Sequence, residues 1–257
     1  MSAVAERPPA LSIVLPVFNE GDNIEAVLTR LLAAVRVSPI EVLVVYDFEE
    51  DTTLPVVRRL MPSMPVVRLH RNAYGRGALN ALRSGLEAAT GEYVLVTMAD
   101  GSDDPADIDR MLASAHDGAD VVAASRHIRG GRQLGGPVVK RVLSKLAGLS
   151  LHWVGGLPVR DPTSNYKLYS RRLLESVTIE SSGGFELALE LTVKAHLAGL
   201  RLAEVPTTWH DRTAGESQFR LAEWLPHYLH WYRLGLTGRV TAARPQARPL
   251  PAPAARR

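Results

Sequence analysis

Five short runs of apolar residues, each apolar on both faces and bounded by turn residues, constrain this chain more than any other feature. The runs cover residues 11–17, 40–45, 66–69, 93–97 and 119–124. Several of the segments between them carry apolar residues at helical spacing, at 22–35, 77–89 and 105–116. Because strands of this kind need a helical layer on each side, they are typical of a parallel sheet. We therefore expect an α/β fold with a mostly parallel sheet covered by helices on both faces.

Composition narrows the class of protein further. Apolar residues make up 46% of the 257 residues and charged residues 22%, which is close to the average of soluble globular domains. The chain has no cysteine, which excludes disulfides, thiolate metal sites and cysteine nucleophiles and fits a reducing compartment. No apolar run reaches the roughly 18 residues of a transmembrane helix. Residues 1–10 lack the apolar core of a signal peptide, so we expect a flexible N-terminus there.

Two segments in the second half combine apolar, aromatic and cationic residues in helical order. They cover residues 137–153 and 219–238 and hold three of the four tryptophans of the chain. Such a mixture is typical of helices that lie on a membrane surface, and also of ordinary helices that cover a core. We favour the membrane surface, with Trp224, Trp231 and Tyr232 at the level of the lipid headgroups.

The last 19 residues have a different composition from the rest. Residues 239–257 contain five arginines, four prolines and no acidic residue. We expect a disordered basic tail whose charge is either solvated or attracted to a polyanion such as lipid headgroups. Nucleic acid is not an expected partner.

Charged side chains follow the ends of the predicted strands, where ligands bind in open parallel sheets. Carboxylates at Asp47 and Asp100 alternate with cations at Arg76 and Arg126 around this edge. A divalent cation together with a diphosphate would use both signs of charge. The sequence lacks the P-loop motif, the glycine-rich turn of dinucleotide-binding folds and the serine-hydrolase elbow, which disfavours those three classes.

In order along the chain, these strand ends resemble family-2 glycosyltransferases of the GT-A fold, and among them the dolichol- or polyprenol-phosphate mannosyltransferases. The resemblance runs from about residue 11 to 220, which implies a GT-A catalytic domain over 11–218. It rests on six segments in register: 15–24 (P-x-F-N-E), 41–53, 71–85, 125–131 (S-R followed by G-G), 161–166 (D-x-T) and 204–217 (E-V-P followed by R-x-x-G-x-S).

The resemblance implies a binding site for a nucleotide sugar, GDP-mannose or UDP-glucose. Asp47 matches the acid that binds the base in this family, although Tyr46 replaces the acid that usually precedes it. The remaining nucleotide-sugar residues implied by the match are Pro16, Phe18, Glu20, Arg76, Gly77 and Asp100.

The resemblance also implies a Mg²⁺ or Mn²⁺ ion on the diphosphate, held in this family by a D-x-D motif. Here Met98 takes the place of the first acid, and methionine is a poor ligand for a hard cation. We expect Ser102 and Asp103 to complete a metal site with Asp100, because Mg²⁺ keeps several waters and needs only one or two carboxylates. Alternatively, Asp103 and Asp104 cap the helix that follows.

Arg126 and Arg212 match family positions that contact phosphates, so the implied catalytic residues are Asp100, Arg126 and Arg212. For an acceptor phosphate we expect Arg126, Arg129 and Ser217, while Gln218 departs from the basic residue usual after that serine. A phosphate monoester is already ionised near neutral pH and needs positioning rather than a general base. If the acceptor were a sugar hydroxyl, Asp161 would be the candidate base.

The sequence thus predicts an inverting, metal-dependent glycosyltransferase that moves a hexose from a nucleotide sugar to a polyprenyl phosphate. It would act peripherally at the cytoplasmic face of the membrane, and a small membrane-anchoring protein is a further candidate partner. Two alternatives stay open. One is an enzyme of the same fold with a soluble sugar or natural-product acceptor, and the other is a non-catalytic nucleotide-binding partner of a membrane protein.

Overall fold

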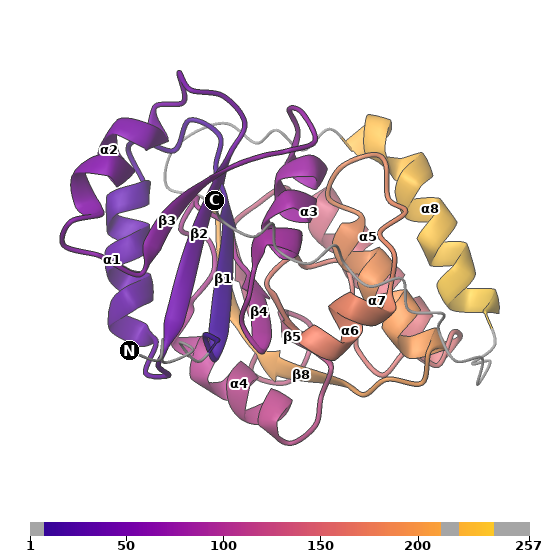
Figure 1. Ribbon diagram of the computed structural model, residues 1–257. Helices are drawn as coiled ribbons and strands as arrows, with labels where there is room; N and C mark the ends of the chain where they lie inside the picture. Colours follow the sequence, from indigo (N-terminus) through magenta and orange to yellow (C-terminus); the bar gives the residue numbers. More distant parts are fainter. Residues whose placement is uncertain (1–7, 212–220, 239–257) are drawn as a thin grey trace.

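One sheet of seven strands organises the computed structural model, which describes residues 8–211 and 221–238 (Figure 1). Most of the N-terminus expected at 1–10, and all of the tail expected at 239–257, lie outside these ranges. The strand order is β3-β2-β1-β4-β7-β5-β8. The strand bounds are β1 Leu11–Pro16, β2 Ile40–Tyr46, β3 Val67–Arg71, β4 Tyr93–Val96, β5 Val121–Ser125, β7 Lys167–Ser170 and β8 Leu202–Pro206. Only β7 is antiparallel to its neighbours, which confirms the mostly parallel sheet.

Helices cover both faces of this sheet, as the two-sided apolar strands require. Along β1, Ile13 and Leu15 pack into one layer and Val14 into the other. The first layer holds α1 Ile24–Ala34, α2 Thr53–Leu60, the 3-10 helix η1 Pro105–Asp107 and α4 Ile108–His116. The second holds α3 Ala78–Ala88, α6 Arg171–Ser176 and α7 Leu187–Leu197. The α/β class with helices on both faces is confirmed.

Strand β7 and helix α7 are two of the elements between residues 160 and 200 that have no counterpart in the sequence prediction. Strand β7 is four residues long and includes the fully buried Lys167, so it presents no apolar run. Helix α7 is buried along most of its length, and a helix covered on several sides has no polar face to reveal its periodicity. Both elements are recognisable only from their tertiary surroundings.

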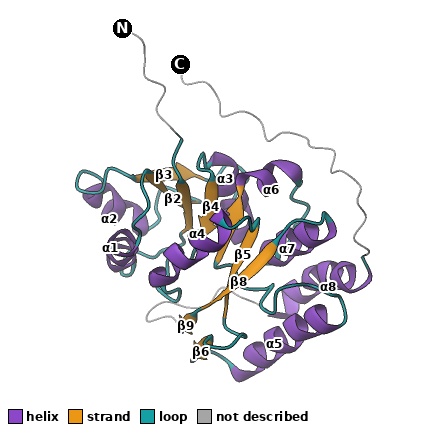
Figure 2. Ribbon diagram, turned by 90° about the horizontal axis from the view of Figure 1, so that it is seen from below, coloured by secondary structure: helices purple, strands orange, loops and turns teal. Residues whose placement is uncertain are grey.

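Two long helices, α5 Val138–Trp153 and α8 Leu221–Thr237, lie side by side against the second layer (Figure 2). The Tyr232 hydroxyl and Ser150 Oγ are 2.7 Å apart and join the two helices. Close to this bond, Gly155 and Gly235 allow a near approach of the backbones, because a Cβ on Gly155 would lie 2.5 Å from the Gly235 carbonyl oxygen. These helices occupy the two segments in which amphipathic helices are expected.

Trp231 corrects the expectation that the aromatic residues of α8 face a membrane. Its side chain is 3% exposed and packs in the core, where the Lys194 ammonium lies 4.9 Å from the ring centroid. A ring enclosed in this way is not available to lipid headgroups. The side chain of Trp224 lies outside the described part of the chain.

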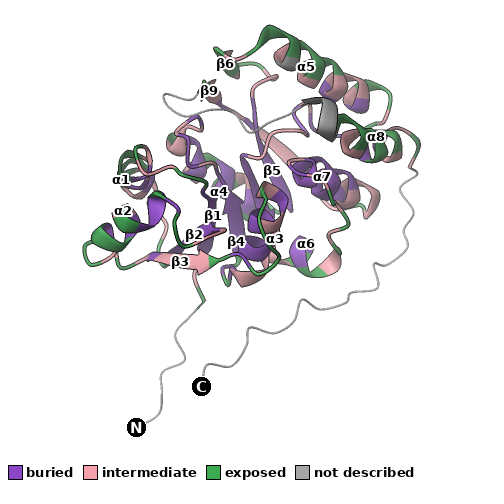
Figure 3. Cartoon of the chain, turned by 90° about the horizontal axis from the view of Figure 1, so that it is seen from above, coloured by how far each residue is buried: buried purple, intermediate pink, exposed green. Residues whose placement is uncertain are grey.

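Helix α5, in contrast, carries several exposed apolar residues, and much of it has the colour of exposed residues in Figure 3. Val139 is 66% exposed and Leu146 58% exposed, and Trp153 at its C-terminal end is 75% exposed. On α8, Leu225 and Leu229 are also exposed, by 46% and 42%. Within the described residues, no helix is both long and apolar enough to cross a membrane.

The opposite positions of Trp231 and Trp153 generate the first prediction. Trp231→Ser should lower the free energy of unfolding by about 3–5 kcal/mol, because it removes a large buried ring. Trp153→Ser should change it by less than about 0.5 kcal/mol, because that ring is exposed. Urea unfolding of the two variants checks this, and equal losses of stability would contradict the core position of Trp231.

Candidate active site

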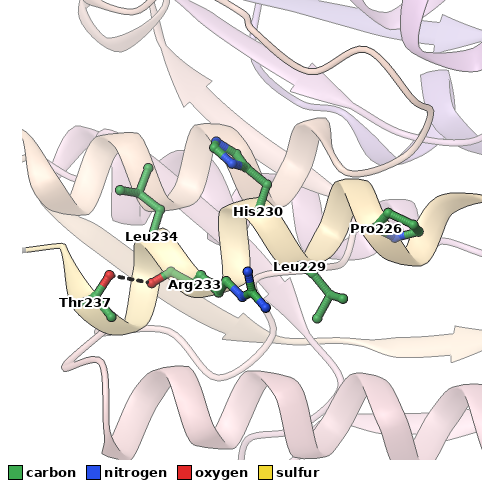
Figure 4. Close-up of a pocket in the computed structure, with 6 residues that line it drawn as sticks. All are labelled: Pro226, Leu229, His230, Arg233, Leu234 and Thr237. Atoms are coloured by element: carbon green, nitrogen blue, oxygen red, sulfur yellow. Dashed lines mark hydrogen bonds between the residues drawn. The ribbon is translucent and has the colours of Figure 1, made fainter.

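A cavity of about 950 Å³ lies beyond the carboxyl ends of the parallel strands. Its walls come from the ends of β1, β2, β4 and β5, from the loop at 163–166 and from both α5 and α8. A second hollow, of about 460 Å³, lies along α8 (Figure 4). Among the described residues, those that line it all belong to α8 and include no carboxylate, and Thr237 Oγ1 donates to the Arg233 carbonyl there at 2.9 Å. The charged residues predicted from the strand ends instead converge on the larger cavity.

Asp47 follows β2 and lines this cavity. Its carboxylate accepts hydrogen bonds from Asn72 Nδ2 at 2.7 Å and from the Gly77 backbone N–H at 2.9 Å. Gly77 has φ +135°, a conformation that side chains other than glycine rarely adopt. The loop after β3 is thereby fastened to the carboxylate expected to bind the base.

Aromatic and cationic side chains form the outer rim beside Asp47. The Arg76 guanidinium lies 4.5 Å from the centroid of the Phe48 ring, and Phe48 meets Phe18 edge to face at 5.7 Å. Phe18 and Arg76 line the cavity, as do Pro16 and Glu20. The predicted nucleotide-sugar residues are therefore brought together, and Phe48 joins them as a residue that the sequence did not single out.

The remaining acid of the D-x-D motif, Asp100, lies near Asp103, and both line the cavity. Asp103 accepts hydrogen bonds from Thr97 Oγ1 at 2.9 Å and from the Met98 backbone N–H at 3.1 Å. Its carboxylate thus stands against the backbone of Met98, the residue that replaces the missing acid. The capping alternative holds for Asp104, whose side chain accepts from the Ala106 N–H at 3.1 Å.

The pair Asp100 and Asp103, with Ser102 between them, suits a hard divalent cation. Burial and the negative charge of Asp100 raise the pKa of Asp103 to about 7. A divalent cation would relieve this repulsion, and carboxylate and hydroxyl oxygens are the donors that Mg²⁺ and Mn²⁺ prefer. Among the described residues, no group of three His, Asp or Glu side chains is placed to hold a metal. The donors therefore fit an ion that also uses water and phosphate oxygens.

Arg126 and Asp161 form a buried, two-pronged ion pair at the end of β5. Arg126 Nε donates to Asp161 Oδ2 at 2.7 Å and its terminal nitrogen donates to Oδ1 at 2.8 Å. The side chains are 14% and 0% exposed. Burial alone would raise the pKa of Asp161, but the charge and hydrogen bonds of Arg126 hold it well below its usual range. A carboxylate whose two oxygens are both bound by Arg126 is a weak proton acceptor. Asp161 therefore serves to position Arg126.

Lys167 holds the loop that carries Asp161 by hydrogen bonds to its backbone. The lysine ammonium is fully buried and donates to the backbone carbonyls of Pro162, at 3.0 Å, and of Ser164. Burial lowers the pKa of Lys167 to about 7. Glu204 of β8 accepts from the Asp161 N–H at 3.0 Å. Three motif segments that are distant in sequence thus meet at this one ion pair.

Arg141 and Ser144 of α5 also line the cavity, and the sequence prediction missed both. Ser144 Oγ lies 2.8 Å from Thr163 Oγ1 and accepts a longer bond, 3.4 Å, from Arg126. Arg141 and Ser144 are three residues apart on a predicted helix, and this spacing could have signalled that two polar side chains share one face of it. Arg129 is exposed and is not among the residues that line the cavity. Arg212 and Ser217 lie outside the described residues.

Comparison with known proteins identifies the family. The model of glycosyl transferase family 2 matches residues 12–178. The chain belongs to this family. It is 30% identical to the polyprenol monophosphomannose synthase of Mycolicibacterium smegmatis over 248 residues, or 90% of this chain and 89% of that protein. It is 32% identical to the undecaprenyl-phosphate mannosyltransferase of Micrococcus luteus over 212 residues, or 80% of this chain and 85% of that protein.

A solved structure shares the fold of this glycosyltransferase. It is the glucosyl-3-phosphoglycerate synthase of Mycobacterium tuberculosis, crystallised with Mn²⁺, UDP and glucosyl-3-phosphoglycerate. The TM-score is 0.64 over 91% of this chain and 82% of that chain, at 21% sequence identity. The GT-A fold expected from the sequence is confirmed, and so is the assignment of the chain as a glycosyltransferase enzyme.

The buried ion pair generates the second prediction. Asp161→Asn should lower the free energy of unfolding at pH 7 by about 3–5 kcal/mol, because it leaves the buried Arg126 without a counter-charge. The folded-state pKa of Asp161 is lowered, so the pair stabilises above the unfolded pKa of about 3.9 and loses this effect as the pH falls further. The difference between wild type and variant should therefore shrink below about pH 4.

Urea unfolding at neutral and acidic pH measures this difference. Asp109→Asn is the matched control, because Asp109 pairs with Arg36 at 3.7 Å on the surface. That control should change stability by less than about 1 kcal/mol at either pH. A loss for Asp161→Asn no larger than that of Asp109→Asn would show that the buried pair does not stabilise the fold.

Proposed function

We propose that this glycosyltransferase moves a hexose from a nucleotide sugar, GDP-mannose or UDP-glucose, to a polyprenyl phosphate. The observation that carries this is the composition of one continuous cavity. Asp47 and Asp100 line its donor end, and Arg126 provides a cation further along. Leu143 and Leu225 line the part between α5 and α8. A ligand with a charged phosphate and an apolar chain is complementary to Arg126 and to the apolar part between α5 and α8. The names of the two relatives agree with such a ligand.

The chemistry assigned to these residues is a direct displacement. The acceptor phosphate is bound by Arg126, Arg141 and Ser144, with Arg126 held in one orientation by Asp161. A phosphate oxygen forms a bond to the anomeric carbon while the bond from that carbon to the nucleoside diphosphate breaks. A single displacement of this kind inverts the configuration. No protein base is needed, because the attacking phosphate already carries its negative charge.

Asp100 and Asp103, with Ser102, would hold a Mg²⁺ or Mn²⁺ ion, which supplies positive charge to the departing diphosphate. Asp47 and the rim of Phe18, Phe48 and Arg76 bind the nucleoside portion. Donor and acceptor phosphates therefore lie at two separate cationic positions, with the hexose between them.

The outer surface of α5 supports a position on the membrane. Val138, Val139, Val142 and Leu146 are between 46% and 66% exposed, and Arg141 and Lys145 lie on the same helix. Apolar side chains bordered by cations suit the headgroup region of an anionic bilayer. A polyprenyl chain can then stay in the bilayer while its phosphate reaches Arg126. We assign the cytoplasmic face, in keeping with a chain that has no cysteine, and this arrangement requires no membrane-anchoring partner protein.

The third prediction tests transfer and the ion together. Purified protein incubated with Mn²⁺, a polyprenyl phosphate and labelled GDP-mannose or UDP-glucose should carry label into the lipid phase. Asp100→Asn should reduce this transfer at least 100-fold, in keeping with the loss of electrostatic stabilisation of the leaving group. Calorimetry should show weaker Mn²⁺ binding by the variant in the presence of the nucleoside diphosphate. Full turnover by wild type in excess chelator would contradict the metal assignment.

The fourth prediction concerns the apolar surface of α5. Val139→Ser combined with Leu146→Ser should release the protein from vesicles that contain anionic lipid, because each side chain loses about 1.5–3 kcal/mol of apolar burial. The fold should survive, since both positions are exposed. Flotation with liposomes measures binding, and Tyr74→Ser, an exposed aromatic in the loop after β3, is the control. Wild-type protein that does not float would favour the alternative with a soluble acceptor.

A further inference from the structure

A ribbon of two short parallel strands borders the cavity. It consists of β6 Arg132–Leu134 and β9 Thr208–His210, in which Gln133 pairs with Trp209. Figure 2 shows the ribbon apart from the main sheet, near the start of α5. Paired residues of neighbouring strands point to the same face, and both Gln133 and Trp209 line the cavity. None of the catalytic or binding roles proposed above uses either side chain.

Backbone hydrogen bonds place this ribbon between the two phosphate positions. The His210 N–H donates to the Ser102 carbonyl at 3.0 Å, beside the carboxylates of the donor end. The Thr207 N–H donates to the Ser125 carbonyl at 3.1 Å, next to Arg126. The face that carries Gln133 and Trp209 therefore spans the interval in which the hexose would lie during transfer.

The side-chain oxygen of Gln133 lacks a hydrogen-bond partner. Oε1 is buried, and among the described residues it is the one unpartnered buried side-chain atom that belongs to a residue lining the cavity. A buried amide without a partner costs free energy unless a ligand supplies one. A sugar hydroxyl both donates and accepts, so it can satisfy either end of the amide.

Gly136 shows how closely this pair of side chains is packed. A Cβ on Gly136 would lie 3.3 Å from Gln133 Nε2 and 3.4 Å from the Trp209 ring. The backbone at Gly136 thus covers the amide nitrogen and the ring edge on one side, while the Asp211 carboxylate holds that turn by accepting from the Gly136 N–H at 3.1 Å. The amide and the ring are consequently fixed beside each other.

We propose that Gln133 and Trp209 form the surface that recognises the transferred hexose, with Gln133 binding a sugar hydroxyl and Trp209 contacting the C–H face of the ring. This assignment rests on the proposed function, because it requires a nucleotide-sugar donor. It explains why a polar amide and an aromatic ring are paired on a ribbon that spans the two phosphate positions.

The test compares binding of nucleotide sugars with binding of the nucleoside diphosphates alone. Titration calorimetry with GDP-mannose, UDP-glucose, GDP and UDP is carried out on the full chain in the presence of Mn²⁺. Gln133→Met keeps the volume and removes the amide, so it should weaken the preferred nucleotide sugar roughly three- to tenfold, as expected for one lost hydrogen bond. Affinity for the matching nucleoside diphosphate should stay within about twofold, since the diphosphate and base sites are untouched.

Three further variants sharpen the result. Trp209→Leu should weaken the nucleotide sugar selectively, and Trp209→Phe should restore most of the affinity because it keeps an aromatic face. Leu134→Ala is the control, since Leu134 lies on the same strand but is 49% exposed and alternates to the other face. It should leave both affinities unchanged.

The possible outcomes separate this inference from the proposed function. If Gln133→Met weakens nucleotide sugar and nucleoside diphosphate equally, or weakens neither, the hexose assignment is wrong while the proposed function stands. If wild-type protein binds none of the four nucleotides, the proposed function fails first. Selective loss of the nucleotide sugar in Gln133→Met and in Trp209→Leu, but not in Leu134→Ala, supports the assignment.

Discussion

The ion pair between Arg126 and Asp161 is the interaction on which the rest of the cavity depends. Removing two charges from water is costly, and geometry of this quality is needed to recover the cost. Both oxygens of Asp161 accept from Arg126, and the Asp161 N–H is bound in turn by Glu204. Because the carboxylate neutralises Arg126 without covering it fully, the guanidinium still lines the cavity. A cation can thereby be held rigidly in a largely buried place and still meet an anionic ligand.

The same pair determines the shape of the molecule around it. Asp161 belongs to the loop that leads into β7, the antiparallel strand, and Lys167 at the start of β7 fastens that loop by its backbone carbonyls. The reversal of chain direction in β7 brings the loop to the carboxyl end of β5, where Arg126 follows. A parallel strand in this position would deliver its preceding loop to the opposite edge of the sheet. The antiparallel strand is therefore what joins the two motif segments.

The sequence predicted the residues whose position follows from strand ends. Asp47 and Arg126 come directly after the buried strands β2 and β5, and Asp100 lies in the turn after β4, so parallel strands carry all three to one edge. It did not predict Arg141 and Ser144, because these reach the cavity from a helix whose orientation is set by tertiary packing. The amphipathic pattern of α5 and α8 was recognised, but a pattern does not say which apolar side chains are covered. In the structure, Trp231 is buried against α7, whereas several apolar side chains of α5 are exposed.

Ser144 connects the exposed helix α5 to the loop that holds Asp161. It lies on α5, the helix with the exposed apolar surface, and its hydroxyl is 2.8 Å from Thr163 Oγ1 on the loop that holds Asp161. One turn further along, Gly148 brings the helix so close to the same loop that a Cβ would lie 2.0 Å from the Arg160 carbonyl oxygen. A helix fastened to the loop at two successive turns cannot shift without displacing it. Any surface that binds the outside of α5 therefore also fixes the position of Arg126 relative to that surface.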